Sequence, residues 1–324
     1  MDQEQMEPRP ARPTIASFFA KSRAWLNGSL FVLTIVSAFV VGINWSASYK
    51  YAEDIGRDPR FVPPAGIFKD PQIVWLSLLY AAVLMIILLG HELGHYLTCR
   101  RYRIDATLPY FIPMLGFIGT MGAFIKIKSP ITQKRQLFDV GVAGPLTSFL
   151  LAVPALVYGL HLSKVIPNLP SSEGYLLGEP LLMKIIGAVF FKNAGADSAI
   201  ILHPMAFAGW VGLLVTALNL FPLGQLDGGH VSYAIFGSRS KTVAKIFLAI
   251  YLIMAIFFWF GWLVWALLIL LLGLKHPRIL DEDSSLGPKR TILSILILVI
   301  FILSFIPDPI KGYNIIDLIK QYWP

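Results

Sequence analysis

Residues 72–98 have the sequence QIVWLSLLYAAVLMIILLGHELGHYLT, an apolar stretch that ends in the ionisable residues His91, Glu92 and His95. As a helix it would extend about 40 Å at 1.5 Å per residue, enough to cross the hydrocarbon core of a bilayer. The rest of the chain is similarly apolar, since 56% of its 324 residues are hydrophobic, 14% are charged and the mean hydropathy is +0.67. Soluble domains are about 25% charged. The composition therefore excludes a single water-soluble globule and predicts a membrane protein.

Working outward from this stretch, we expect about seven transmembrane helices and hence an all-α polytopic membrane protein. The apolar segments are 29–45, 72–98, 139–160, 203–222, 244–258, 260–274 and 291–306. Residues 242–274 would extend about 50 Å as one helix, longer than the bilayer is thick. The aromatic cluster at 257–262 favours two short helices joined by a tight turn.

The distribution of positive charge predicts the orientation. The net charge is +8, and 18 of the 27 Lys and Arg residues fall in segments that lie inside if the N-terminus is inside. This twofold excess predicts that the N-terminus is inside and the C-terminus outside. The basic residues occupy short gaps between apolar segments rather than one continuous face, which argues against nucleic-acid binding. The sole cysteine, Cys99, excludes an intrachain disulfide and a zinc site built from cysteines.

Three further segments are expected to have other roles. Residues 1–25 contain three prolines and three acidic residues, which favours a cytosolic tail over a signal peptide. Residues 104–128 are apolar but interrupted by Pro and Gly, and residues 123–128 alternate as a half-buried strand does, so we predict a small membrane-associated β-hairpin. Residues 313–324 fit an amphipathic helix at the outer interface.

His91 and His95 are four residues apart, so both imidazoles lie on one face of a helix and can reach one ion. Glu92 lies beside them, where it can hold a metal-bound water. A pair of hydrogen-bonded core histidines is the structural alternative. Three ionisable side chains within a membrane helix are costly, however, and favour a functional site. The pattern predicts a metal centre for Zn²⁺.

A catalytic zinc ion needs a third protein ligand, and Asp227 is the best candidate. It follows Pro222 and Gly224, which end the fourth span on the side of the membrane where the histidine-bearing span also ends. Residues 228–229 are both glycine and are expected to let the backbone turn tightly behind the aspartate. His230 is the rival third ligand.

The other three histidines are expected to lie away from the metal. His161 lies beyond the outer end of the third span and His276 follows the sixth, so both should be solvated. His203 precedes Pro204 at the start of the fourth span, on the opposite side of the membrane from the metal. We expect it to cap the helix or to line a substrate path.

Two motifs together resemble the site-2 protease family of intramembrane zinc metalloproteases. Residues 91–95 are HELGH and residues 219–228 are NLFPLGQLDG, similar to the family's HExxH helix and its N-x-x-P-x-x-x-x-D-G-type motif on a later helix. Residues 141–145 (GVAGP) and 203–210 (HPMAFAGW) resemble further family features, and the similarity covers residues 72–235. Residues 161–202 are too short and too apolar for a PDZ domain. The resemblance therefore indicates a compact form without PDZ or CBS domains.

The resemblance implies that His91, His95 and Asp227 bind one zinc ion, that Glu92 is the general base and acid, and that Asn219 contacts the substrate or the oxyanion. The implied activity is a zinc-dependent endopeptidase that cleaves transmembrane segments of membrane proteins within or near the bilayer.

Together with the pattern of apolar segments, this divides the chain into three expected parts. A cytosolic tail (1–25) precedes a protease domain at 26–277, with its core at 72–235. Residues 278–324 then supply a cytosolic linker, the last transmembrane helix and an interfacial segment. We expect a bacterial or archaeal plasma membrane, because no organelle-targeting segment is apparent; a plastid membrane is the alternative.

Three other functions fit parts of the pattern. An HExxH protease of the CAAX-processing or heat-shock type would take its third ligand from a Glu in a downstream apolar helix, and no acidic residue after Asp227 lies in such a helix. An ion-coupled transporter would show two related halves with paired broken helices, and no such symmetry is evident. A catalytically inactive membrane-binding homologue stays open, although every inferred catalytic group is present.

Overall fold

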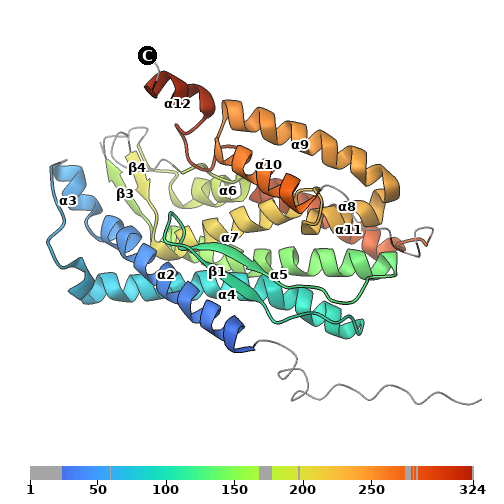
Figure 1. Ribbon diagram of the computed structural model, residues 1–324. Helices are drawn as coiled ribbons and strands as arrows, with labels where there is room; N and C mark the ends of the chain where they lie inside the picture. Colours follow the sequence, from blue (N-terminus) through green and yellow to red (C-terminus); the bar gives the residue numbers. More distant parts are fainter. Residues whose placement is uncertain are drawn as a thin grey trace, which may run out of the picture.

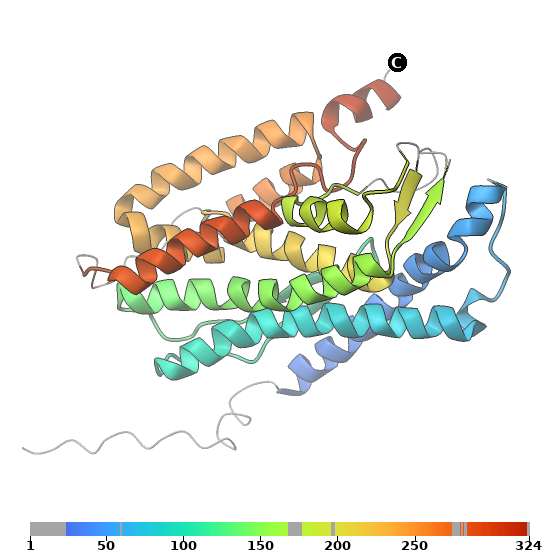
Figure 2. The ribbon, with the colours of Figure 1, turned by 180° about the vertical axis from the view of Figure 1, so that it is seen from behind.

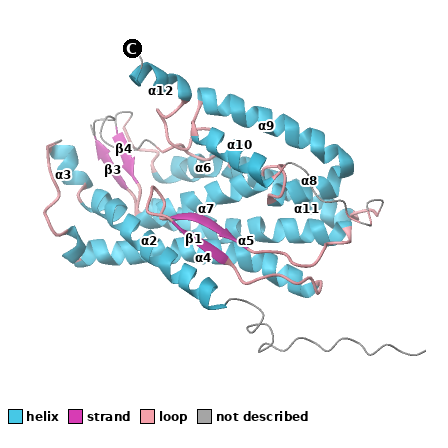
Figure 3. Cartoon of the chain, viewed as in Figure 1, coloured by secondary structure: helices cyan, strands magenta, loops and turns pink. Residues whose placement is uncertain are grey.

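The computed structural model describes residues 24–58, 60–167, 177–195, 198–273, 279, 281 and 284–322. These residues form an elongated bundle of helices (Figures 1 and 2) with small β elements on its side and at one end (Figure 3). The long helices are α2 (Ala24–Lys50), α4 (Pro71–Arg101), α5 (Lys134–His161), α7 (Pro204–Leu220), α9 (Ser240–Phe257), α10 (Gly261–Leu272) and α11 (Pro288–Ser304). The short ones are α3 (Ala52–Arg57), η1 (Ile67–Lys69), α6 (Leu181–Phe190), α8 (Asp227–Phe236), η2 (Gly237–Arg239) and α12 (Ile315–Tyr322).

Each of the seven predicted apolar segments is helical over most of its length. Within the described residues, four helices are long and apolar enough to cross a membrane: α2, α4, α5 and the stretch Asp227–Phe257, which joins α8 to α9. Helices α7, α10 and α11 have 17, 12 and 17 residues. The expectation of two helices within 242–274 is confirmed, because α9 ends at Phe257 and α10 begins at Gly261. The fold is therefore mainly helical, with four helices of membrane-spanning length.

Helix α4, which carries the histidine motif, begins at a well-formed N-terminal cap. The Asp70 carboxylate accepts hydrogen bonds from the backbone N–H groups of Gln72 (3.0 Å) and Ile73 (3.3 Å), and Pro71 occupies the first helical position. Lys50, the last residue of α2, also pairs with Asp70. The lysine hydrogen bond, followed by those from the helix backbone, holds the pKa of Asp70 below its usual value. The start of α4 is thus fixed to the end of α2.

Helix α5 lies at the centre of the site region and packs against α4, α7 and α8. Glycines at the crossings make this close packing possible. A Cβ atom added to Gly94 on α4 would collide with the Ala143 carbonyl of α5, and one added to Gly141 on α5 would collide with the first turn of α8. Small residues at helix crossings let the backbones approach in this way. The packing brings the histidine-bearing turn of α4 next to the start of α8.

The predicted β-hairpin is confirmed. Strands β1 (Tyr110–Pro113) and β2 (Thr120–Phe124) pair antiparallel beside α2 and α4. Regular pairing ends at Phe124 rather than continuing through residue 128, where only a single bridge between Ala106 and Ile127 remains. Side chains of α2 and α4 donate hydrogen bonds to carbonyl groups around the hairpin: Asn27 to Pro109, Ser37 to Gly119, Trp45 to Phe117 and Tyr80 to Ile118. Exposed backbone groups at membrane depth need such partners, and these bonds fix the hairpin to the bundle.

A second sheet was not expected from the sequence. Strands β3 (Lys164–Pro167) and β4 (Ser198–Ile201) pair antiparallel at the end of the bundle opposite the C-terminus of α4, and α6 lies between them in the chain (Figure 1). The predicted C-terminal helix is confirmed as α12, although residues 323–324 lie outside the described residues. Most of the predicted tail at 1–25, and residues 278, 280, 282 and 283 at the start of the predicted linker, also lie outside them.

Candidate metal centre

Three potential metal ligands converge where α4 meets α8. The Nε2 atoms of His91 and His95 lie 3.2 Å apart, and each lies 3.2 Å from Oδ2 of Asp227. Among the described residues these three form the group of His, Cys, Asp and Glu side chains that is compact enough to hold a metal ion. Both histidine side chains are buried, and Asp227 is nearly so. The predicted ligand set is thus brought together from helices 132 positions apart in the sequence.

The donor atoms are in a state that suits a metal ion. The buried Oδ2 of Asp227 accepts no well-formed hydrogen bond, which is costly for a carboxylate oxygen without another partner. Nδ1 of His95 lies 2.8 Å from the backbone carbonyl of Val140, so this nitrogen carries a proton, and in the neutral ring Nε2 is the nitrogen that presents a lone pair. An outer partner that orients a ring in this way is the usual support of a metal-binding histidine. The three residues therefore fit a zinc ion.

Gly144 on α5 explains how the His95 ring fits into the packed helices. A Cβ atom at this position would overlap the imidazole ring of His95. The glycine thus leaves the space that the ring occupies, and the neighbouring Gly141 does the same for the start of α8. These two glycines belong to the GVAGP sequence at 141–145. In this chain the two glycines leave space for two of the three candidate ligands, His95 and the start of α8 that carries Asp227.

Glu92 is buried beside the candidate ligands, with only 4% of its surface exposed. Its carboxyl group lies close enough to His91, His95 and Asp227 for their charges to act on it. The backbone N–H of Ile125, the residue that follows β2, also lies close enough to act electrostatically on it. The predicted catalytic acid and base is therefore placed between the ligand cluster and the β-hairpin.

Asn219 also reaches the cluster, from the last turn of α7. Its Nδ2 atom lies 3.4 Å from Nε2 of His91. The helix ends one residue later, at Leu220, and Gly224 has a positive φ of 50° in the connection to α8. Pro222 and Gly224 therefore end the helix as expected. The sequence placed Asn219 and Asp227 on the same side as the histidines, and the structure brings all four residues together.

The backbone behind Asp227 differs from the expected turn. Asp227 is the first residue of α8, so Gly228 and Gly229 are helical rather than part of a tight turn. A Cβ atom on Gly228 would collide with the Leu220 carbonyl, and one on Gly229 with the Gly224 carbonyl. The glycines are needed for the close approach of α8 to the end of α7. The prediction of a turn was wrong because packing overrides the low helix propensity of glycine.

The other histidines lie outside the cluster. His203 caps α7, its Nδ1 accepting a hydrogen bond from the Met205 backbone N–H at 3.2 Å, so the capping role is confirmed. His161 is exposed at the end of α5, as expected. His230 lies in the first turn of α8 and is not a member of the compact ligand group. His276 lies outside the described residues.

Sequence reasoning missed two hydroxyl groups. Ser148 Oγ lies 3.1 Å from Nδ1 of His91, and Thr216 Oγ1 lies 2.8 Å from Ser148 Oγ. A serine and a threonine in apolar helices are common, and no sequence signal distinguishes these two. Only the register of α5 and α7 against α4 identifies them.

The fold and the site together define a helical membrane protein with a metallopeptidase-type centre, in which an HExxH helix and a later aspartate supply the candidate ligands. Comparison with known families gives the narrower assignment. The family model described as peptidase family M50 matches residues 79–261, more than half of the chain. The chain belongs to this family, which confirms the resemblance to the site-2 proteases.

Several curated proteins are similar to the chain. The probable zinc metalloprotease EGY1, chloroplastic, of Arabidopsis thaliana is 30% identical over 297 residues, which cover 86% of this chain and 52% of that protein. The protein of the same name in Oryza sativa subsp. japonica is 32% identical, over 64% of this chain and 37% of that protein. The probable zinc metalloprotease EGY2, chloroplastic, of Arabidopsis thaliana is 31% identical, over 50% of this chain and 29% of that protein. The chain thus spans about half the length of these relatives or less. No solved structure matches it.

Proposed function

We propose that the protein is a zinc-dependent endopeptidase that cleaves transmembrane segments of membrane proteins within or near the bilayer. The observation that carries the proposal is the convergence of His91, His95 and Asp227 beside the buried Glu92, inside a bundle of apolar helices. Membership of peptidase family M50 and the zinc metalloprotease names of the relatives support both the metal and the reaction.

In this proposal each residue of the site has one task. His91, His95 and Asp227 hold the ion, and bound zinc lowers the pKa of water from 15.7 to about 7. Glu92 takes a proton from the attacking water and delivers it to the leaving amine of the cleaved peptide bond. The amide Nδ2 of Asn219, which already lies at the ligand cluster, donates a hydrogen bond to the substrate carbonyl oxygen as negative charge develops there.

The β-hairpin supplies a way to hold an unwound substrate. Strand β2 has no second strand partner among the described residues, and its Met121 and Phe124 side chains are about half exposed. An extended peptide that pairs with such an edge gains main-chain hydrogen bonds. The strand runs directly to Ile125, whose N–H lies near the Glu92 carboxyl group. A substrate added to β2 would therefore reach the general base.

A helical substrate hides its peptide bonds, so we expect cleavage to favour helices that unwind easily. The test uses proteoliposomes containing the purified chain and a single-span reporter with a Leu/Ala helix, made with and without a central Gly-Pro pair. The Gly-Pro reporter should be cut more than ten times faster, because a helix interior loses about 3 kcal/mol through proline and about 1 kcal/mol through glycine. Mass spectrometry should place the cut within the apolar segment.

Addition of 1,10-phenanthroline, a zinc chelator, serves as the control and should stop the reaction. Cleavage confined to the extramembrane parts of the reporter, or cleavage that resists the chelator, would contradict the proposal. Zinc binding without cleavage of any reporter would favour the inactive homologue. A proton current through the liposomes would favour the transporter.

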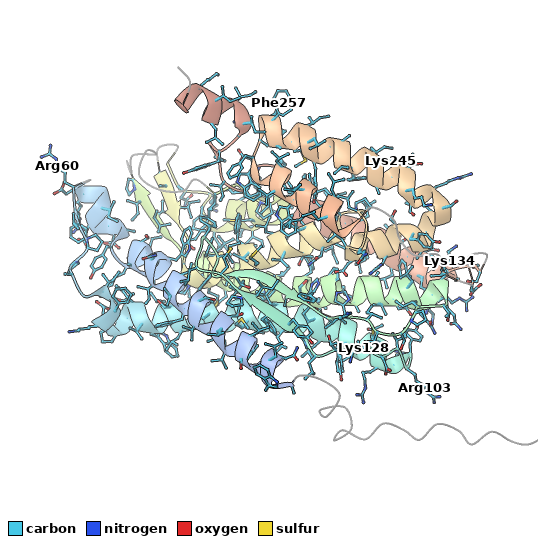
Figure 4. All side chains as sticks on the ribbon, in the orientation of Figure 1. Arg60, Arg103, Lys128, Lys134, Lys245 and Phe257 are labelled. Carbon is cyan, nitrogen blue, oxygen red and sulfur yellow. The ribbon has the colours of Figure 1, made fainter. Side chains whose placement is uncertain are left out.

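We propose that the seven predicted spans cross the membrane with the N-terminus inside. Arg103, Lys128 and Lys134 lie at the end of the bundle where α4 ends and α5 begins, and Arg60 lies at the opposite end (Figure 4). With Cys99 replaced by alanine, a cysteine at position 128 should react with a membrane-impermeant maleimide only after the cells are opened, and one at position 60 in intact cells. The reverse pattern would refute this orientation.

The remaining expectations are retained as proposals. The protease domain is proposed to occupy 26–277 with its core at 72–235, and the partners are a transmembrane protein substrate and the lipid bilayer. The comparisons lend no support to a bacterial or archaeal membrane. The chloroplastic names of the relatives fit the plastid alternative, and fractionation of the source organism, followed by immunoblotting, tests it.

A further inference from the structure

The two candidate metal-binding histidines are oriented by different kinds of partner. Nδ1 of His95 faces the backbone carbonyl of Val140, an acceptor that no substitution of a side chain removes. Nδ1 of His91 faces the hydroxyl of Ser148 at 3.1 Å. A hydroxyl can donate or accept, so the protonation of His91 depends on where the Ser148 proton goes. That question is decided by the neighbours of Ser148.

The hydrogen-bond pattern around Ser148 offers its proton two acceptors other than His91. The Thr216 hydroxyl donates to the Gly212 carbonyl one turn earlier in α7, at 2.7 Å, so its Oγ1 is free to accept. Ser148 Oγ lies 2.8 Å from this oxygen and 3.1 Å from the Pro145 carbonyl, two acceptors for its single proton. When Ser148 donates to either of these oxygens, it can only accept at Nδ1 of His91. His91 then carries its proton on Nδ1 and presents the lone pair of Nε2 to the other two ligands.

Burial makes this arrangement depend on the protein alone. Ser148 and Thr216 are both 0% exposed, so bulk water does not compete for these bonds. If Ser148 instead donated to His91, the ring would carry its proton on Nε2, pointing at His95 and Asp227, and could not bind a metal there. A fixed tautomer removes this competing state before the ion arrives.

We infer that Ser148 is a positioning residue that holds His91 in the metal-binding tautomer and orientation, with Thr216 as a secondary support. The inference rests on the proposed zinc site. Loss of an outer partner of this kind typically weakens metal binding 10–100-fold. Thr216 matters less, because the Pro145 carbonyl remains as an acceptor for the Ser148 proton when the threonine hydroxyl is removed.

The experiment measures zinc affinity of the purified full chain in detergent by competition with a chromophoric chelator. Ser148→Ala should bind zinc 10–100-fold more weakly than wild type. Ser148→Cys, which keeps the size and leaves a weak acceptor, should be intermediate, and Thr216→Val should lose less than Ser148→Ala. The visible absorption bands of the Co²⁺-substituted Ser148→Ala variant should also shift, because the His91 ring is less firmly oriented.

The matched control is Thr147→Val, which removes the adjacent hydroxyl of α5. That hydroxyl donates to the Ala143 carbonyl at 2.8 Å and, within the described part of the chain, makes no hydrogen bond to a histidine, so zinc affinity should stay at the wild-type level. Thermal unfolding of the metal-free proteins separates a general loss of stability from a loss of metal affinity. Equal affinity of Ser148→Ala and wild type, or an equal loss in Thr147→Val, would overturn the inference. A wild-type chain that binds no zinc would instead overturn the proposed function.

Discussion

Replacing Asp227 with alanine is expected to remove zinc from the purified protein, whereas wild type retains one ion per chain. The carboxylate supplies the oxygen that lies 3.2 Å from Nε2 of both His91 and His95. With two histidines left, the ion keeps only two protein ligands, one fewer than catalytic zinc sites use. The loss of affinity should exceed the 10–100-fold effect of an outer-shell change. Elemental analysis of zinc per chain after dialysis measures it.

His230→Ala is the matched control for this experiment, because His230 is the rival third ligand three positions further along α8. It lies outside the compact ligand group, so the variant should keep its zinc. Depletion of zinc in His230→Ala with retention in Asp227→Ala would reverse the assignment. Both variants leave Gly228 and Gly229 unchanged, so the contact of α8 with the end of α7 is the same in each.

The position of Asp227 could be predicted from the sequence, but its surroundings could not. Counting spans placed the end of α7 on the same side as His91 and His95, and Pro222 and Gly224 marked where the helix ends. Both inferences need only local propensity and topology. The helical state of Gly228 and Gly229 depends instead on carbonyl groups of a neighbouring segment, which a sequence pattern does not contain.

The same distinction explains why the second sheet was not predicted from the sequence. Strands β3 and β4 have four residues each and pair across 30 intervening positions, so neither carries a periodic signal long enough to detect. The β1–β2 hairpin was predictable because prolines and glycines interrupt an apolar segment over a short distance. The contact of Ser148 with His91 could not be predicted from the sequence either, since it depends on the register of α5 against α4.

Replacing Glu92 with glutamine is expected to stop cleavage while leaving zinc bound. Glutamine has nearly the same shape and keeps a side-chain oxygen as an acceptor next to the Ile125 N–H. What it lacks is the ability to take up a proton. Loss of a general acid and base typically slows a reaction 10²–10⁴-fold. The Gly-Pro reporter in proteoliposomes provides the rate, and elemental analysis provides the zinc content.

Glu53→Gln is a suitable control. Glu53 lies in α3, where it pairs with Lys164 at 3.3 Å, so this variant should leave the rate unchanged. An active Glu92→Gln variant would show that another group moves the proton, and a zinc-free one would show that Glu92 supports the ligand set itself.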